Sequence, residues 1–204
     1  TPRTLLAVLI LVSGVLSAIF LNDTIVLMFT PLVLEITRTL QRNPIPYLVG
    51  LVSAANIGST ATITGNPQNM IIGIASRIPF VEFTAALAPV ALAGLLIAWI
   101  VLVLVYRGEF STPHFEQAPH FEPTLYRPLL WKGMLASGLM LLAFILGLPI
   151  PLAALSAAAL LLITRRLKPQ RVFREMDWGL LVFFSGLFIV TGAIETAGLS
   201  QGLF

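Results

Sequence analysis

Residues 55–69 read ANIGSTATITGNPQN, a polar stretch inside an apolar protein. It carries repeated hydroxyl and amide side chains, and its Gly65 and Pro67 both interrupt helical geometry. An apolar run from Tyr47 to Ile63 leads into the polar part, and the apolar piece after it, residues 70–75, is far shorter than the roughly 20 residues of a membrane span. We therefore predict one discontinuous transmembrane helix over residues 47–76. Non-helical backbone at membrane depth is tolerated only where protein or a water-filled cavity satisfies it, so the break predicts a site.

The overall composition is that of a protein surrounded by lipid. Of 204 residues, 57% are hydrophobic and 10% are charged, whereas about 25% are charged in an ordinary soluble domain. The net charge of +3 comes from basic residues in short loops between apolar segments, which is a membrane orientation signal and not a nucleic-acid-binding face. Cysteine is absent, which excludes disulfides and thiolate chemistry. We expect an all-α polytopic membrane protein that contacts the lipid bilayer and no nucleic acid.

A second polar interruption lies at Asn22-Asp23-Thr24. The apolar runs on either side, residues 5–21 and 25–40, have roughly 17 residues each, which is slightly short for a full crossing. We predict a re-entrant helical hairpin over residues 5–40 with this polar tripeptide at its tip; the alternative is an ordinary interfacial turn. A carboxylate at membrane depth costs several kcal/mol unless it is paired, hydrated or protonated. Asp23 is therefore a candidate coupling group.

The remaining chain continues the polytopic pattern. Residues 83–106 predict a full span, residues 107–128 a cytoplasmic polar loop, and residues 129–204 further apolar helices. If the broken helix crosses once, eleven basic residues share one side and only Arg77 lies opposite. The positive-inside rule then puts the crowded side in the cytoplasm, and we expect a bacterial-type inner (plasma) membrane.

Several other polar residues have plainer explanations. His114 and His120 lie in the Pro-rich loop without further ligands nearby, so a solvated loop is favoured over a metal site. Glu35 and Glu195 are near predicted span ends, where interfacial placement is expected. The alanines of residues 153–158 have small-residue spacing, which is typical of a helix-packing face.

The two polar motifs resemble those of the ion transporter superfamily, which includes the arsenite pump/NhaD-type antiporters and the citrate transporter-like divalent anion:sodium symporters. The resemblance rests on residues 22–31 and 55–69 and continues more weakly in residues 176–188. The family fold has two inverted repeats, each with a re-entrant hairpin and a broken helix. The resemblance implies that residues 1–106 end a first repeat, that residues 129–204 start a second, and that the chain is a fragment of a longer transporter.

Two departures from the symporter pattern bear on the substrate. The hairpin tip reads Asn-Asp-Thr where the symporters show Ser-Asn-Thr, which adds the titratable Asp23 and is closer to the arsenite/NhaD-type branch. The broken helix has Asn66-Pro67-Gln68 in place of the symporters' Thr-Pro-Pro. The substrate therefore cannot be transferred from the family.

The resemblance implies that the hairpin tip and the broken helix form one half-site for a cation and a substrate. Hydroxyl and carbonyl oxygens suit a hard cation, and we expect Na⁺ at Asn22, Ser59 and Gly65. Amides at the start of a half-helix suit an anion. Helix packing by small and hydroxyl side chains is the alternative. The candidate binding residues are Asn22, Asp23, Thr24, Ser59, Thr60, Thr62, Gly65, Asn66 and Asn69.

We expect secondary active transport of a small inorganic or organic anion or oxyanion, coupled to Na⁺ or H⁺, with no cofactor and no enzymatic reaction. A Na⁺/H⁺ antiporter, in which Asp23 binds the two cations by turns, is the alternative. A non-transporting membrane scaffold is a weaker one. Assembly as a homodimer is left open by the sequence, as are the transported species and the coupling ion.

Overall fold

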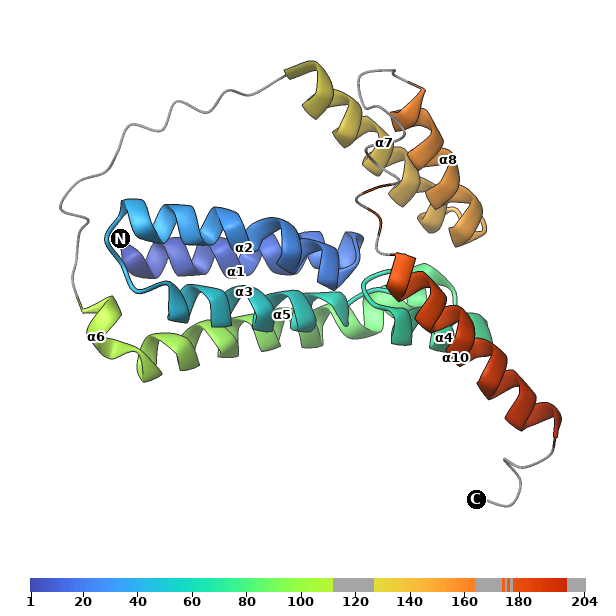
Figure 1. Cartoon of the computed structure of the whole chain (residues 1–204), viewed down its shortest axis with the longest axis horizontal. Coiled ribbons are helices and arrows are strands. Elements are labelled where there is room, and N and C mark those ends of the chain that lie inside the picture. The colour runs from blue at the N-terminus through green and yellow to red at the C-terminus, as the bar shows by residue number, and fades with distance from the viewer. Residues whose placement is uncertain (112–126, 164–173, 175, 177, 198–204) are drawn as a thin grey trace. The chain divides into compact units, whose positions relative to one another are not determined.

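The computed structural model describes residues 1–111, 127–163, 174, 176 and 178–197 (Figure 1). Within these residues every regular element is an α-helix. Contacts divide the chain into two units, Thr1–Leu155 and Ser156–Phe204. Three helices of the described part are long and apolar enough to cross a membrane, namely α1 (Pro2–Ile19), α5 (Phe80–Val105) and α7 (Arg127–Ile145). The prediction of an all-α polytopic membrane protein is confirmed.

Helix α3 (Pro44–Ser59) is the centre of the first unit. It packs against α1, α5 and α2 (Asn22–Thr39), and these four helices lie side by side in Figure 1. Its buried Leu51 and Ala54 meet apolar side chains of α1 and α5 such as Leu6 and Leu102. In a lipid environment such packing gains van der Waals contact and not hydrophobic transfer energy, because the lipid tails are as apolar as leucine.

Glycines bring α1 and α3 together. A Cβ added to Gly58 would collide with the backbone of Gly14 and would lie 2.5 Å from its Cα. A Cβ on Gly14 would in turn meet the side chain of Leu95, at 2.8 Å. Small residues at such a crossing allow two backbones to approach closely.

The predicted hairpin corresponds to α1 and α2, which are separated only by Phe20 and Leu21. Asn22, Asp23 and Thr24, which were expected between the two arms, instead form the first turn of α2. An acidic side chain is favourable there because the amide end of a helix is positive. The re-entrant path of this hairpin stays a prediction.

The predicted discontinuous helix corresponds to α3 and α4 (Pro67–Ser76). Proline is favoured at the first position of α4, and the Asn66 side chain caps this helix by accepting from the backbone N–H of Asn69, at 2.8 Å. Helix α3 ends at Ser59, four residues before the expected Ile63. Residues 60–66 are therefore non-helical, and all of them except Thr60 are buried.

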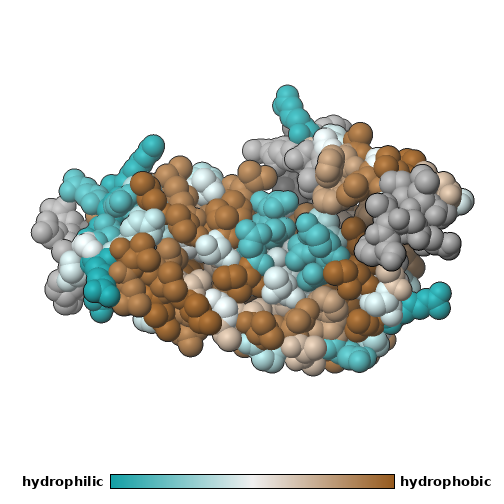
Figure 2. Space-filling view, turned by 90° about the horizontal axis from the view of Figure 1, so that it is seen from below, coloured by the Kyte–Doolittle hydropathy of each residue, from teal (hydrophilic) through white to brown (hydrophobic). Residues whose placement is uncertain are grey.

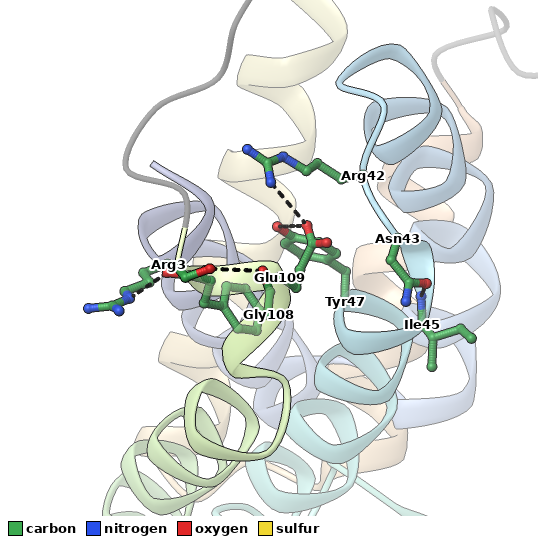
Figure 3. A network of polar contacts seen from close by, with 9 residues as sticks. Arg3, Arg42, Asn43, Ile45, Tyr47, Gly108 and Glu109 are labelled. Atoms are coloured by element: carbon green, nitrogen blue, oxygen red, sulfur yellow. Dashed lines mark hydrogen bonds and ion pairs between the residues drawn. The ribbon is translucent and has the colours of Figure 1, made fainter.

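Polar contacts join the opposite end of the first unit (Figure 3). Glu109, on the short α6 (Arg107–Phe110), lies 3.9 Å from the guanidinium of Arg42 and accepts a hydrogen bond from the Tyr47 hydroxyl at 3.4 Å. Arg3 donates from Nε to the carbonyl of Phe110, at 3.0 Å. These contacts bring together the beginnings of α1 and α3 and the segment that follows α5. Arg3, Arg42 and Arg107 lie in or directly beside these segments, and Arg38 lies in the last turn of α2.

Three further helices follow in the part of the chain that the structure describes. Phe144 of α7 packs on Phe80 of α5, with ring centroids 5.3 Å apart. Helices α8 (Ile150–Leu162) and α10 (Trp178–Thr196) present mostly exposed apolar side chains. Most of the predicted loop with His114 and His120 lies in residues 112–126, which are outside the described residues. The side chain of Glu195 is also outside the described part. Glu35 is exposed, near the end of α2.

Candidate functional site

The start of α2 is joined directly to the break between α3 and α4. The backbone N–H of Asn22 donates to the carbonyl of Gly65, at 3.0 Å. The Asn22 side chain donates from Nδ2 to Oδ1 of Asn56 on α3, at 3.1 Å. Asn56 is itself held by a bond from its Nδ2 to the carbonyl of Val52, at 3.0 Å. The two polar motifs recognised in the sequence thus meet in one place.

The end of α1 is tied to the same region by two hydroxyl groups. Ser17 donates to the carbonyl of Ala55, at 2.7 Å, and is fully buried. Thr62, inside the break, donates to the carbonyl of Ala18. Because both acceptors are backbone carbonyls near helix ends, these bonds fix how the hairpin and the broken helix fit together.

Within the break, two asparagine side chains replace the missing helical hydrogen bonds. Asn66 donates from Nδ2 to the hydroxyl of Ser59, at 3.1 Å, and to its carbonyl, at 3.3 Å. Asn69 donates to the carbonyls of Ser59, Thr60 and Thr62, at 3.2, 3.3 and 2.9 Å. The last carbonyls of a helix have no intrahelical donor, so these amides satisfy the end of α3 inside the protein.

Gly65 is required by close approach and not by its backbone dihedral angles. A Cβ at this position would collide with the carbonyl oxygen of Ser59 and lie 2.6 Å from its Cα. The chain therefore folds back onto the end of α3, which leaves the Gly65 carbonyl aimed at Asn22.

One polar atom of this network has no hydrogen-bond partner among the described residues, the Oδ1 atom of Asn22, although it is buried. A buried acceptor without a donor costs about 1–3 kcal/mol. The hydroxyl of Ser59 and the carbonyl of Gly65, by contrast, already take part in hydrogen bonds.

Three of the sequence-predicted residues are exposed on the first unit. Asp23 and Thr24 lie on the surface at the start of α2, and Thr60 lies on the surface at the end of α3. The Thr60 hydroxyl donates to the carbonyl of Ile57, at 2.7 Å. Figure 2 shows that hydrophilic residues lie in the middle of a mostly hydrophobic face as well as at its ends. The structure therefore gathers Asn22, Ser59, Thr62, Gly65, Asn66 and Asn69 into one network and leaves Asp23, Thr24 and Thr60 at its edge.

The site lies part-way along α5. Ile57, near the end of α3, meets Gly94 of α5, while Gly50 meets Leu102, so the two helices run antiparallel. Residues 80–93 of α5 continue past the end of α3 for about 20 Å, at 1.5 Å per residue. Helices α3 and α4 have 16 and 10 residues, so together they contain as many helical residues as α5, which has 26.

Two residues of this network were missing from the sequence-based candidates, Asn56 and Ser17. Asn56 lies inside the polar stretch of residues 55–69, where it is one of several amide side chains. The neighbouring sequence does not indicate which of these amides faces the hairpin. Ser17 follows Ser13 by one helical turn in an otherwise apolar helix. That spacing is the signal that could have identified the face of α1 that packs on α3.

Comparison with known proteins shows the family to which the chain belongs. The family model described as citrate transporter matches residues 1–204, the whole chain. The chain belongs to the citrate transporter family. An uncharacterized transporter of Mycobacterium bovis is 30% identical over 212 residues, which cover 100% of this chain and 49% of that protein. A 46 kDa membrane protein of Mycobacterium leprae is 28% identical, over 95% of this chain and 47% of its own length.

A further relative carries a more specific name. A silicon efflux transporter of Oryza sativa subsp. japonica is 26% identical over 263 residues, which cover 99% of this chain and 54% of that protein. The chain thus spans about half the length of the curated relatives it matches. Family membership and the apolar helices identify an integral membrane protein of a transporter family.

Proposed function

We propose that this chain supplies one half of the transport site of a secondary active transporter, which moves an anion or oxyanion coupled to Na⁺ or H⁺. The observation that carries the proposal is the meeting of the α2 start with the α3–α4 break, where the buried Oδ1 of Asn22 lacks a hydrogen-bond partner among the described residues. A buried free acceptor oxygen beside several carbonyls is suited to a cation. Because the chain covers about half of its relatives, we expect the complete site to include groups from outside it.

The cation side of the proposal centres on Asn22. A Na⁺ ion at this position would take Oδ1 of Asn22 and could share the lone pairs of Ser59 and Gly65, which are close in the same network. Neutral oxygens are normal ligands for a hard cation. A carbonyl oxygen has two lone pairs, so one existing hydrogen bond does not prevent it from binding an ion.

The anion side rests on two helix starts. Helix α2 begins at Asn22 and α4 begins at Pro67, and the bond from Asn22 to Gly65 holds these two starts close together. Each contributes the positive end of a helix dipole, which favours a negative ligand. Broken helices that present such ends near the bilayer midplane are a common way for transporters to bind ions and substrates.

The location along α5 supports a site within the membrane. Residues 80–93 extend about 20 Å beyond the end of α3, and the hydrocarbon core of a bilayer is about 30 Å thick. If α5 crosses the bilayer, the break lies well inside it. The end of α1 lies at the level of the break, because Thr62 donates to the carbonyl of Ala18 there. If the break lies inside the bilayer, α1 also ends inside it, which favours a re-entrant hairpin.

Asp23 is the proposed coupling group because it is an exposed carboxylate beside this network, on the turn that begins α2. We expect transport of the complete protein in everted vesicles to depend on a Na⁺ or pH gradient. Replacing Asp23 by Asn should abolish or shift that dependence. Glu35→Gln is the matched control, since it removes an exposed carboxylate from the same helix, well away from the network.

The assay scans candidate anions and oxyanions while Na⁺ and pH are varied separately. Anion flux that follows one of the gradients in the unmodified protein, and loses it in Asp23→Asn alone, would support the proposal and identify the coupling ion. Cation exchange that needs no anion would favour a Na⁺/H⁺ antiporter instead. Normal coupling in Asp23→Asn would remove Asp23 from the mechanism.

A further inference from the structure

A groove of the first unit lies between α1 and α5, and none of the residues that line it belongs to the half-site. It has a cavity volume of about 340 Å³ and is lined by apolar side chains, among them Ala7 and Leu11 of α1 and Leu92 and Leu96 of α5. Ile10 and Leu95, which belong to the buried core, form its floor. Leu11, Leu92 and Leu96 are each more than half exposed at its edges. An apolar hollow that opens to hydrocarbon favours occupation by a flexible acyl chain, because an unfilled void loses dispersion contacts.

One end of the groove has the features of a membrane interface. Trp99 lines the groove there and donates from Nε1 to the backbone carbonyl of Arg3, at 3.3 Å. Tryptophan is enriched at the boundary between the hydrocarbon core and the headgroups, where its ring is apolar and its N–H is bonded. Ala7, which lines the groove, lies one helical turn beyond Arg3 on α1. The apolar part of the groove therefore begins about one turn away from the contact between Arg3 and Trp99.

The charge at this end favours an anion. Arg3 is exposed, and its Nε donates to the carbonyl of Phe110 (Figure 3). Because the Arg3 carbonyl also accepts from Trp99, which lines the groove, Arg3 lies at this end of the groove. A guanidinium has five N–H donors, and a planar pair of them matches a phosphate group. Among the described residues, the helix ends on this side of the unit carry four arginines, Arg3, Arg38, Arg42 and Arg107, and two glutamates, Glu35 and Glu109.

We propose that the groove binds one acyl chain of an anionic phospholipid, with the lipid phosphate on Arg3. The apolar walls take the chain, Trp99 marks the depth at which the headgroup begins, and Arg3 supplies the positive charge. Basic residues beside a cleft between transmembrane helices recognise acidic headgroups in this way. In the orientation expected from the basic residues, this lipid comes from the cytoplasmic leaflet. The site is separate from the half-site and does not depend on the transported substrate.

The test is the quenching of Trp99 fluorescence by lipids with brominated acyl chains. The complete protein is placed in nanodiscs with Trp99 as its only tryptophan, Trp131, Trp178 and any others being changed to Phe. Brominated phosphatidylglycerol and brominated phosphatidylcholine are compared at equal mole fraction. We expect an occupancy about fivefold higher for phosphatidylglycerol, the factor that one basic residue near the membrane surface contributes.

Matched variants separate the two parts of the site. Arg3→Gln should bring the preference close to one, while Arg38→Gln, which removes an exposed arginine at the end of α2, should retain it. Ala7→Phe fills the groove and should lower quenching by both lipids. Val8→Phe, one residue along on the exposed surface of α1, should not.

Three results would overturn the proposal. Equal quenching by the two lipids would remove the anionic selectivity. An equal loss of preference in Arg3→Gln and Arg38→Gln would assign the attraction to the basic end as a whole. Quenching by neither lipid would mean that protein, either the rest of the natural chain or a second copy, covers the groove. The effect of Arg3→Gln is independent of Ala7→Phe, so misfolding of the groove-filling variant leaves the test intact.

Discussion

At the scale of single residues, Asn22 links the two polar motifs through separate groups. Its backbone N–H binds Gly65, its Nδ2 binds Asn56, and its Oδ1 is the buried atom proposed for the cation. Asn22→Ala keeps the backbone bond but removes the other two groups. We expect the affinity for the coupling ion to fall at least about tenfold, the equivalent of losing one charge-assisted contact.

This loss is measured as the Na⁺ concentration that gives half-maximal transport in vesicles. Asn43→Ala is the control, because Asn43 caps α3 at the opposite end of the unit by accepting from the N–H of Ile45, at 3.1 Å. That variant should lose about 1 kcal/mol of stability and keep its ion dependence. Unchanged ion dependence in Asn22→Ala would contradict the assignment of its Oδ1 to the cation.

A second residue-scale prediction concerns Asn69, whose side-chain amide donates to the carbonyl of Ser59 at the end of α3 and to the carbonyls of Thr60 and Thr62 in the break. Asn69→Ala leaves all three without this donor inside the protein. We expect a loss of about 3 kcal/mol or more in the free energy of unfolding. The neighbouring Gln68 is exposed, and Gln68→Ala should change it by less than about 0.5 kcal/mol. Thermal unfolding midpoints in detergent would show the contrast, and equal midpoints for the two variants would refute it.

At the scale of elements, the crossing of α1 and α3 depends on glycine. Gly58→Ala would push a Cβ into the backbone of Gly14, which cannot turn away, so the helices would have to separate. Gly94→Ala, between α3 and α5, would meet only a side-chain methyl group of Ile57, at 2.9 Å. We expect Gly58→Ala to cost more than about 3 kcal/mol and Gly94→Ala about 1–3 kcal/mol, because the Ile57 side chain can shift to some extent, although its β-branched χ1 is stiff in a helix, whereas the Gly14 backbone cannot.

The comparison is made on detergent-purified protein by thermal unfolding, with transport as a second readout. Separation of α1 from α3 would also misalign Ser17 and Ala55, so Gly58→Ala should lose transport as well as stability. A Gly58→Ala protein as stable as Gly94→Ala would mean that the two helices do not cross as closely as the structure has them.

At the scale of the whole molecule, the path of the chain through the membrane can be tested directly, since residues 1–204 contain no cysteine. Thr39 ends α2 and Ser76 ends α4, and both are exposed. If α3 and α4 together make one crossing, Thr39→Cys and Ser76→Cys lie on opposite sides of the membrane. A membrane-impermeant maleimide should then label Ser76→Cys in intact cells and Thr39→Cys only in everted vesicles.

The same experiment tests the expected orientation. Labelling of both cysteines from one side would mean that α3 and α4 cross separately or not at all, and the broken-helix interpretation would fail. Opposite-side labelling in the reversed sense would keep the broken helix but invert the positive-inside prediction. Either position can serve as the control for the other, because both are exposed helix ends in the same unit.

Local composition was enough to predict the class of the protein and the places where its helices are interrupted. Long apolar runs with few charges predict helices in lipid, because a helix pairs every backbone group within its own segment. Proline at position 67 and the amides around it marked the start of α4, since these are rules about one residue and its nearest neighbours. The motif residues also indicated the transporter family, which the whole-chain family match confirms.

Only the tertiary structure decided where α3 ends and which polar atoms meet. The sequence extended the helix to Ile63, but α3 stops at Ser59 because the chain folds back until Gly65 touches Ser59 and the amides of Asn66 and Asn69 reach its carbonyl. Likewise, the direction of the α2 start gives Asn22 a different environment from Asp23 and Thr24. The Asn22 side chain contacts α3, whereas the side chains of Asp23 and Thr24 are exposed. Contacts between residues far apart in the chain fix these features, and no local pattern in the sequence encodes such a contact.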